Sequence, residues 1–273
     1  MTTTQATTPA TTASTEPLLE LRGVSKNFGS VQALTEVDFE VRAGEVMALV
    51  GDNGAGKSTL IKCVAGIHNA DGGEIIFDGQ PVTIHSPKDS ASLGIEVVYQ
   101  DLALCDNLDV VQNMYLGREA HDIFQRLKEP EMERRTAETM KGLAVTTIRS
   151  IRQPVATLSG GQRQSVAVAR AVMWNSRLVI LDEPTAALGV AQTEQVLELV
   201  ARLAQQGLAV VLISHNLHDI FAVADRITVL RLGRSIAVYD RDKTNQQEVV
   251  GAITAGVPTK VSGITMTDPE VAP

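Results

Sequence analysis

The sequence predicts an α/β fold with a mostly parallel central sheet, and two observations point to it. Three aliphatic runs end in polar residues, which is typical of buried parallel strands that carry polar groups at one edge of a sheet. Aromatic residues make up only 3% of the 273 residues. The core is therefore aliphatic, which suits this class better than an aromatic-rich sandwich. The three runs are Val46–Val50, Leu178–Leu181 and Leu208–Ser214.

The ends of the chain are expected to lie outside the folded domain. Residues 1–17 are mostly Thr, Ala, Pro and Ser, without the basic start or apolar stretch of a signal peptide, and predict a disordered tail. Residues 255–273 are similarly polar and predict a loose C-terminal tail. The globular domain is expected to span 18–254, and its 44% hydrophobic content can bury a large core.

Charge, hydropathy and cysteine content exclude several classes of protein. A net charge of -8 and a pI near 5.2 argue against a nucleic-acid partner. The longest apolar run, 208–213, is far shorter than the roughly 20 residues of a membrane-spanning helix. Cys63 and Cys105 have neither metal-ligand spacing nor the density of a disulfide scaffold. They predict two ordinary buried thiols in a reducing compartment.

A glycine-rich phosphate loop follows the first predicted strand and precedes a predicted helix. Residues 51–59 satisfy the pattern G-x-x-x-x-G-K-[ST], with strand, loop and helix in the required order. Glycines let the backbone curl around phosphate oxygens, and the helix N-terminus adds partial positive charge. Lys57 is expected to contact the β- and γ-phosphates, and Ser58 to ligate magnesium. The predicted nucleotide-binding residues here are Gly51, Asn53, Gly54, Gly56, Lys57, Ser58 and Thr59.

Two carboxylates follow the second strand, and a histidine follows the third. Asp182 is predicted to hold magnesium, and Glu183 to orient the water that attacks the γ-phosphate. His215 is predicted to sense the γ-phosphate because of its place at a strand end, although lone histidines more often cap helices or lie at the surface. Asn216, with Asp219 three residues later, predicts a helix N-cap.

A five-residue segment between these motifs is more specific to one protein family than the phosphate loop or the acidic pair. Leu158–Gln162 resembles the signature of ABC transporter ATPases, and it ends 20 residues before Asp182, a spacing typical of that family. Gln100, the segment 184–188 and His215 match further motifs of the family in the same order. The resemblance covers nearly all of residues 18–254.

The resemblance implies a P-loop NTPase (RecA-like) core, an antiparallel β subdomain and an α-helical subdomain inserted at about 101–154. The stretch 125–143, charged and helix-favouring, independently supports the insertion. The family binds ATP and Mg²⁺, and the signature completes the site of a second subunit. Phe28 then either stacks on adenine or packs on the core. The resemblance assigns catalysis to Glu183, His215, Gln100 and Lys57, magnesium to Ser58, Asp182 and Gln100, and signature contacts to Ser159, Gly161 and Gln162.

Within the family the chain resembles ATPases of monosaccharide importers of the ribose, xylose and fructose type. This implies a peripheral protein on the cytoplasmic face of the inner membrane. Its partners would be a second ATPase subunit, expected to be identical, a transmembrane permease and an extracytoplasmic sugar-binding protein. One departure is Gly189, where relatives commonly carry an acid. The alternatives are an ATPase for amino acids, lipids or export, or a nonhydrolysing nucleotide-binding subunit.

Overall fold

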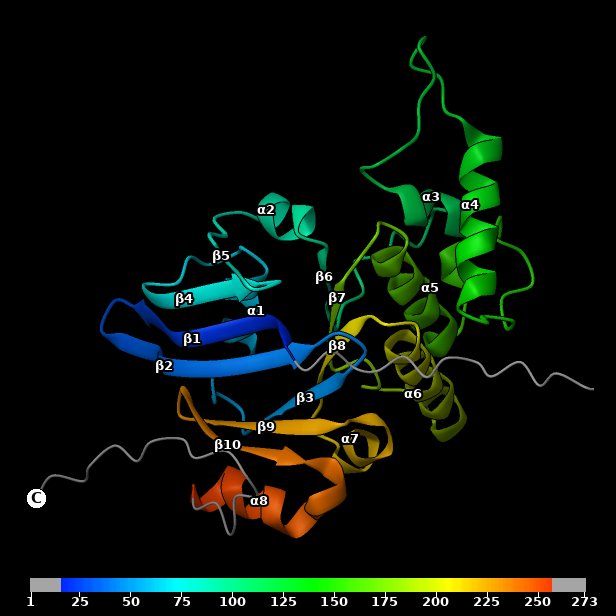
Figure 1. Cartoon of the computed structure of the whole chain (residues 1–273). Coiled ribbons are helices and arrows are strands. Elements are labelled where there is room, and N and C mark those ends of the chain that lie inside the picture. The colour runs from blue at the N-terminus through cyan, green and yellow to red at the C-terminus, as the bar shows by residue number, and fades with distance from the viewer. Residues whose placement is uncertain (1–15, 257–273) are drawn as a thin grey trace, which may run out of the picture.

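Six strands form the central sheet of the computed structural model, which describes residues 16–256 (Figure 1). All neighbouring pairs from β9 to β6 are parallel, and only β10 pairs antiparallel with β9. The prediction of a mostly parallel sheet is confirmed. In spatial order the strands are β10 (Arg234–Asp240), β9 (Arg226–Arg231), β3 (Val46–Val50), β8 (Ala209–Ile213), β7 (Leu178–Asp182) and β6 (Ile95–Val98).

A second, antiparallel sheet lies beside the central one and provides the expected β subdomain. Its order is β2 (Val31–Arg42), β1 (Pro17–Phe28), β4 (Gly72–Phe77) and β5 (Gln80–Val82). Strand β1 begins one residue before the expected domain start at 18, and the last helix ends at Ala255, one residue past the expected end. The rest of the two predicted tails, 1–15 and 257–273, lies outside the described residues.

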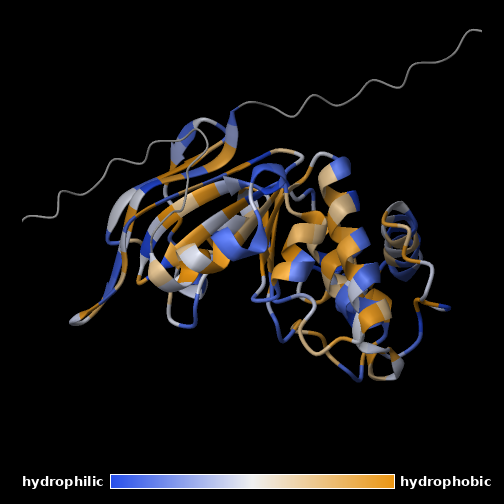
Figure 2. Ribbon diagram, turned by 90° about the horizontal axis from the view of Figure 1, so that it is seen from below, coloured by the Kyte–Doolittle hydropathy of each residue, from blue (hydrophilic) through white to orange (hydrophobic). Residues whose placement is uncertain are grey.

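The central sheet is buried on both faces, which explains why its strands are continuous aliphatic runs. Alternate residues of β3 point to opposite faces. Val46, Ala48 and Val50 pack with helices α5 and α6, whereas Met47 and Leu49 pack with α1 and the antiparallel sheet. Figure 2 shows apolar residues concentrated on the strands and the inner sides of the helices.

The helices lie around these sheets, and two of them, α3 and α4, lie in the segment 101–154 that forms the helical lobe. The segment 101–154 contains no named strand, as expected of a helical insertion. No helix in the described part of the chain is long and apolar enough to cross a membrane. The helices are α1 (Lys57–Val64), α2 (Pro87–Ser92), α3 (Val110–Tyr115), α4 (Glu129–Gly142), α5 (Gly160–Val172), α6 (Val190–Gln205), α7 (Leu217–Val223) and α8 (Gln246–Ala255), with short 3₁₀ turns at Val155–Thr157 and Arg241–Lys243.

An aromatic and basic cluster lies where the helical lobe meets the central sheet. The ring of Trp174 is 5.3 Å from that of Tyr115, and the guanidinium groups of Arg118 and Arg135 lie 5.4 and 4.9 Å from the Trp174 ring centre. Arg118 also forms a 2.9 Å ion pair with Glu96 of β6. One side chain thus contacts both the helical lobe and the sheet.

A fully buried amide organises the beginning of the helical lobe. The side chain of Asn113 accepts a 2.7 Å hydrogen bond from the Cys105 amide and donates to the carbonyls of Cys105, Leu108 and Asp109. These bonds close the loop 105–109 onto α3. The carbonyls of Cys105, Leu108 and Asp109 also accept backbone hydrogen bonds from Leu108, Val155 and Asn113. The Asn113 side chain therefore matters most for the Cys105 amide.

Substitution of this amide is expected to destabilise the protein. Asn113→Ala removes the hydrogen bonds of a fully buried side chain and leaves the Cys105 amide without this partner. It should lower the free energy of unfolding by about 1–3 kcal/mol, as measured by urea denaturation. The exposed Asn107 offers a matched control, and Asn107→Ala should change the value by less than about 0.5 kcal/mol. Equal stability of the two variants would contradict the structural role of Asn113.

Candidate functional site

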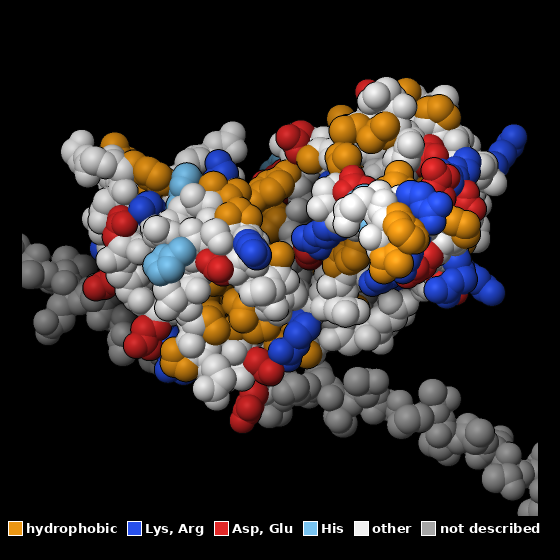
Figure 3. All heavy atoms as spheres, turned by 90° about the horizontal axis from the view of Figure 1, so that it is seen from above, with side chains coloured by type: hydrophobic (Ala, Val, Ile, Leu, Met, Phe, Trp, Pro, Cys, Tyr) orange, Lys and Arg blue, Asp and Glu red, His pale blue; other side chains and the backbone are white. Residues whose placement is uncertain are grey.

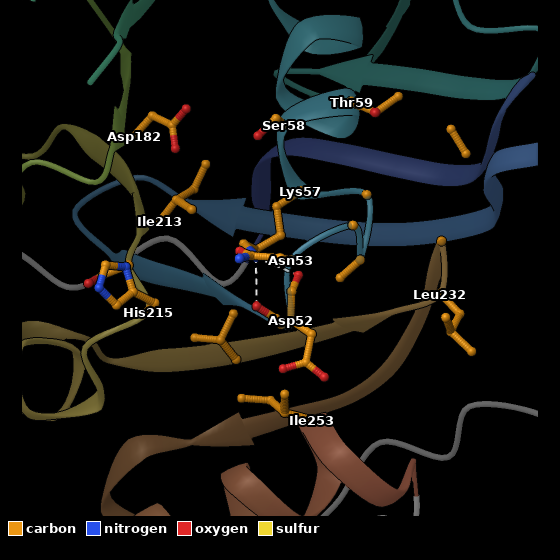
Figure 4. Close-up of a pocket in the computed structure, with 18 of the residues that line it drawn as sticks. Asp52, Asn53, Lys57, Ser58, Thr59, Asp182, Ile213, His215, Leu232 and Ile253 are labelled. Carbon is orange, nitrogen blue, oxygen red and sulfur yellow. Dashed lines mark hydrogen bonds between the residues drawn. The ribbon is translucent and has the colours of Figure 1, made fainter. Parts of the chain in front are cut away.

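A cavity of about 1,120 Å³ opens at the carboxyl ends of the parallel strands (Figure 4). Neighbouring parallel strands deliver their carboxyl ends to one edge, which is where open α/β sheets bind ligands. Residues that lie far apart in the sequence therefore meet here. The cavity brings together Gly51, Asn53, Gly54, Gly56, Lys57, Ser58, Thr59, Gln100, Asp182, Glu183 and His215, all of which the sequence predicted as site residues.

The phosphate loop requires glycine at two positions for steric reasons. Gly51 and Gly56 have φ values of 154° and 104°, which side-chain-bearing residues rarely adopt. A Cβ atom on Gly51 would collide with the carbonyl oxygen of Leu230, and one on Gly56 would lie 2.9 Å from the Leu34 side chain. The loop is thus packed against β9 on one side and leaves its other side open to the cavity.

Lys57, the first residue of α1, lies across this loop. Its Nζ atom donates to the carbonyls of Gly51 and Asp52 at 2.6 and 3.0 Å. Burial lowers the pKa of the Lys57 ammonium, and the nearby carboxylates of Glu183 and Asp182 oppose this shift. The N-cap Gly56 provides no side-chain cap, so the first amides of α1 are left for a ligand. A desolvated cation beside uncapped amides fits a bound polyphosphate.

The acidic pair continues from strand β7. Glu183 has a φ of 51°, and its amide donates to the carbonyl of Ile213 at 2.9 Å. Its carboxylate lies 2.8 Å from Nδ1 of His215, so the expected base and the expected γ-phosphate sensor are in direct contact. The pKa of Asp182 is raised by burial, and further by the charge of Glu183. A bound cation would relieve both effects, and a carboxylate and a serine hydroxyl are hard oxygen donors of the kind that magnesium prefers.

A second set of contacts holds the loops after β7 and β8 together. Asp219 is only 2% exposed, and its carboxylate accepts from the Thr185 hydroxyl at 2.7 Å and from the Asn216 side-chain amide at 2.8 Å. Asn216 is the predicted N-cap of α7, and its side chain accepts from the His218 amide. Asp219 was expected only as part of this cap. Its contact with Thr185 could not be predicted, because the two residues are 34 positions apart.

The signature residues lie at the N-terminus of α5 and do not line the cavity of their own chain. Ser159 is the N-cap, and it forms a capping box with Gln162. The Gln162 side chain also donates to the carbonyl of Thr147 at 2.7 Å. A Cβ atom on Gly160 would lie 2.8 Å from the Leu188 side chain, and one on Gly161 would lie 3.2 Å from Gln192. The signature is thus packed against the segment that follows the acidic pair.

Phe28 is not among the residues that line the cavity. It ends β1, is 44% exposed, and contacts the His68 ring edge-on at 5.1 Å with the Lys26 ammonium 5.5 Å above it. Its contact with adenine stays a prediction. The two cysteines are free thiols, as expected. Cys63 is buried, which raises its pKa to about 11, whereas Cys105 is only partly buried.

Fold and cavity together define a phosphate-loop nucleotide-binding protein of the NTPase class. The family described as ABC transporter matches residues 34–186, and the chain belongs to this family. It is 45% identical to a fructose import ATP-binding protein of Rhizobium meliloti, over 88% of this chain and 94% of that protein. It is 46% identical to a xylose/arabinose import ATP-binding protein of Sulfolobus acidocaldarius, over 90% of this chain and 97% of that protein.

Other relatives differ in length. A ribose import ATP-binding protein of Escherichia coli O157:H7 is 40% identical over 86% of this chain, but the match covers only 46% of that protein. Among solved structures, a nucleotide-free ATP-binding cassette from an ABC transporter is 26% identical, with a TM-score of 0.73 over 84% of this chain and 94% of that one. An ATP-binding cassette in its ADP conformation is 25% identical, with a TM-score of 0.74 over 88% of this chain and 96% of that one.

Proposed function

We propose that the chain is the ATP-hydrolysing subunit of an ABC importer for a monosaccharide. The observation that carries this proposal is the cavity, where the phosphate loop, the acidic pair and His215 meet at one sheet edge. The names of the relatives that match almost end to end, at 45% and 46% identity, support a sugar as the transported substrate.

The predicted catalytic and magnesium-binding residues of the cavity then have roles in phosphoryl transfer to water. Lys57 and the loop amides bind the β- and γ-phosphates, and Glu183 accepts the proton of the attacking water while His215 holds its carboxylate in place. Ser58, Asp182 and Gln100 would hold Mg²⁺, which would neutralise charge on the phosphate oxygens. Such a reaction needs positioning and charge stabilisation rather than covalent catalysis.

Two copies are needed for a complete site. The signature residues Ser159, Gly161 and Gln162 lie at a helix N-terminus, outside the cavity of their own chain. Helix N-termini bind phosphate oxygens. We propose that the signature of each copy closes over the nucleotide bound to the phosphate loop of the other, so that ATP binding forms a homodimer and hydrolysis opens it.

A second hollow is a candidate contact with the permease. It measures about 500 Å³ and lies between α2 and the start of the helical lobe, lined by Pro87, Lys88, Ala91, Ser92 and Arg118. Figure 3 shows apolar and basic side chains side by side on this upper face. A permease segment in this hollow would contact Arg118, which also contacts β6 and Trp174. The chain would then lie peripherally at the cytoplasmic face of the membrane, and sugar would reach the permease from an extracytoplasmic binding protein.

Reconstitution tests the function directly. The chain is purified with its permease in lipid vesicles, and ATP turnover is measured with binding proteins loaded with different solutes. A monosaccharide-loaded binding protein should raise turnover several-fold above the basal rate. Stimulation by an amino acid, peptide or lipid alone would refute sugar import. No turnover under any condition, with ATP still bound, would indicate a nonhydrolysing subunit.

A further inference from the structure

Gln100 lies at a point where the central sheet gives the backbone little support. It follows β6, the edge strand of that sheet, which pairs with β7 on one side only. The last pair of these two strands joins Val98 to Leu181, two residues before Gln100. Gln100 is exposed and lines the cavity. Contacts other than those of the sheet must therefore fix its position.

Two residues with left-handed backbone conformations follow Gln100. Leu102 and Ala103 have φ values of 59° and 45°, a region that residues with a Cβ atom enter only at a cost in free energy. One local hydrogen bond, from the Leu102 amide to the carbonyl of Tyr99 at 2.9 Å, closes the turn. Such conformations persist where the surrounding structure holds them, and they gather at functional sites. The loop therefore needs support from another part of the chain.

Arg170 of α5 provides this support. Its two terminal guanidinium nitrogens donate to the carbonyl of Ala103 at 2.7 Å and to the carbonyl of Leu102 at 2.8 Å. One rigid, planar group thus holds both left-handed residues, although they lie 67 and 68 positions away in the sequence.

The charge of Arg170 is directed to the loop and not to a carboxylate. Glu96, the carboxylate that attracts it most, forms its ion pair with Arg118 instead, at 2.9 Å. Burial lowers the pKa of the Arg170 guanidinium, so this cation is partly desolvated. A desolvated cation needs hydrogen-bond partners, and the two loop carbonyls are these partners. The arginine and the loop after Gln100 therefore stabilise each other.

We propose that Arg170 is a positioning residue for Gln100, a role that rests on the proposed function, in which Gln100 helps to hold Mg²⁺. Arg170 does not line the cavity and touches neither nucleotide nor metal. It fixes the peptide groups that follow Gln100, and through them the place of the Gln100 side chain at the cavity edge. The phosphate loop takes no part in this contact. Removing the guanidinium should therefore slow turnover without weakening the binding of the nucleotide itself.

Amide hydrogen exchange in the nucleotide-free protein tests the contact. Arg170→Met keeps most of the aliphatic side chain and removes the guanidinium. We expect the Leu102 amide, which donates to Tyr99, to exchange at least tenfold faster in this variant, as measured by mass spectrometry. Arg134→Met is the matched control, because the Arg134 side chain is 66% exposed on α4 and pairs with Glu138. Equal exchange in Arg170→Met and the parent chain would overturn the proposal.

Turnover of single and double variants tests whether Arg170 acts through Gln100. Arg170→Met and Gln100→Ala should each slow phosphate release at least tenfold, and the double variant should lie within twofold of Gln100→Ala. Arg134→Met should keep the parental rate, and ATP affinity measured without Mg²⁺ should stay within twofold of the parent in Arg170→Met.

The outcomes separate this role from the proposed function. If the two losses multiply in the double variant, or if Arg170→Met releases phosphate at the parental rate, Arg170 does not position Gln100, and the proposed function stands. If the parent chain releases no phosphate, or if Gln100→Ala keeps the parental rate, the proposed mechanism is wrong, and the role of Arg170 is refuted with it.

Discussion

Replacing Glu183 by glutamine should stop ATP hydrolysis and leave ATP bound. Glutamine has nearly the same shape, so the contact with His215 and the strand-end geometry should persist. It cannot accept the proton of the attacking water, and loss of a general base slows proton transfer about 10²–10⁴-fold. Removing one negative charge also ends the repulsion between Glu183 and Asp182. The variant should therefore bind ATP at least as tightly as the parent chain and accumulate as a dimer.

Phosphate release and light scattering measure the two parts of this result. Glu194 lies on the exposed side of α6 and offers a matched control, with Glu194→Gln expected to keep the parental rate. A Glu183→Gln protein that releases phosphate within twofold of the parent would show that another group removes the proton. Loss of nucleotide binding would instead show that the carboxylate is needed to form the site.

Lys57→Ala is expected to abolish nucleotide binding at micromolar ATP, and turnover with it. In the described part of the chain, Lys57 is the only Lys or Arg residue that lines the cavity. The Lys57 ammonium is already partly desolvated in the folded protein, so less water has to be removed from it when phosphate binds. Charge-assisted bonds contribute more than neutral ones, so their loss should raise the ATP dissociation constant at least tenfold.

Calorimetric titration of ATP measures this loss. Lys141, exposed near the end of α4, provides the control, and Lys141→Ala should bind ATP like the parent. The Lys57→Ala protein should also unfold at nearly the same urea concentration as the parent, since the lysine accounts for only two hydrogen bonds to backbone carbonyls. Normal affinity and turnover in Lys57→Ala would argue that the active phosphate site lies elsewhere.

The strands and the phosphate loop could be predicted from sequence because their determinants are local. Each aliphatic run became a strand close to its predicted bounds, and the strand ends delivered Asp182, Glu183 and His215 to one cavity. The prediction for the helical lobe was less detailed. The stretch 125–143 was described as helix-favouring, and within it α4 begins at Glu129, with Pro130 in its first turn. Proline is tolerated there and not in a helix interior.

Long-range contacts could not be predicted in the same way. The turn before α4 is held by Asp122, whose carboxylate accepts from the amides of Phe124 and Arg126. The bond between Thr185 and Asp219, and the approach of α8 to the cavity, both depend on how distant segments pack. No local pattern in the sequence specifies them. The cavity residues Val250 and Ile253 of α8 were for this reason absent from the predicted site.

The aromatic cluster between the lobes also gives the protein an optical property. Trp174 is the only tryptophan of the chain. Two guanidinium groups lie within about 5.4 Å of its ring centre, and one of them is also paired with Glu96 on the central sheet. Indole emission depends on nearby charge and solvent, and here all of it originates at the boundary between the lobes. The unlabelled protein therefore carries a single intrinsic fluorophore at the place where movement of the helical lobe would change its surroundings.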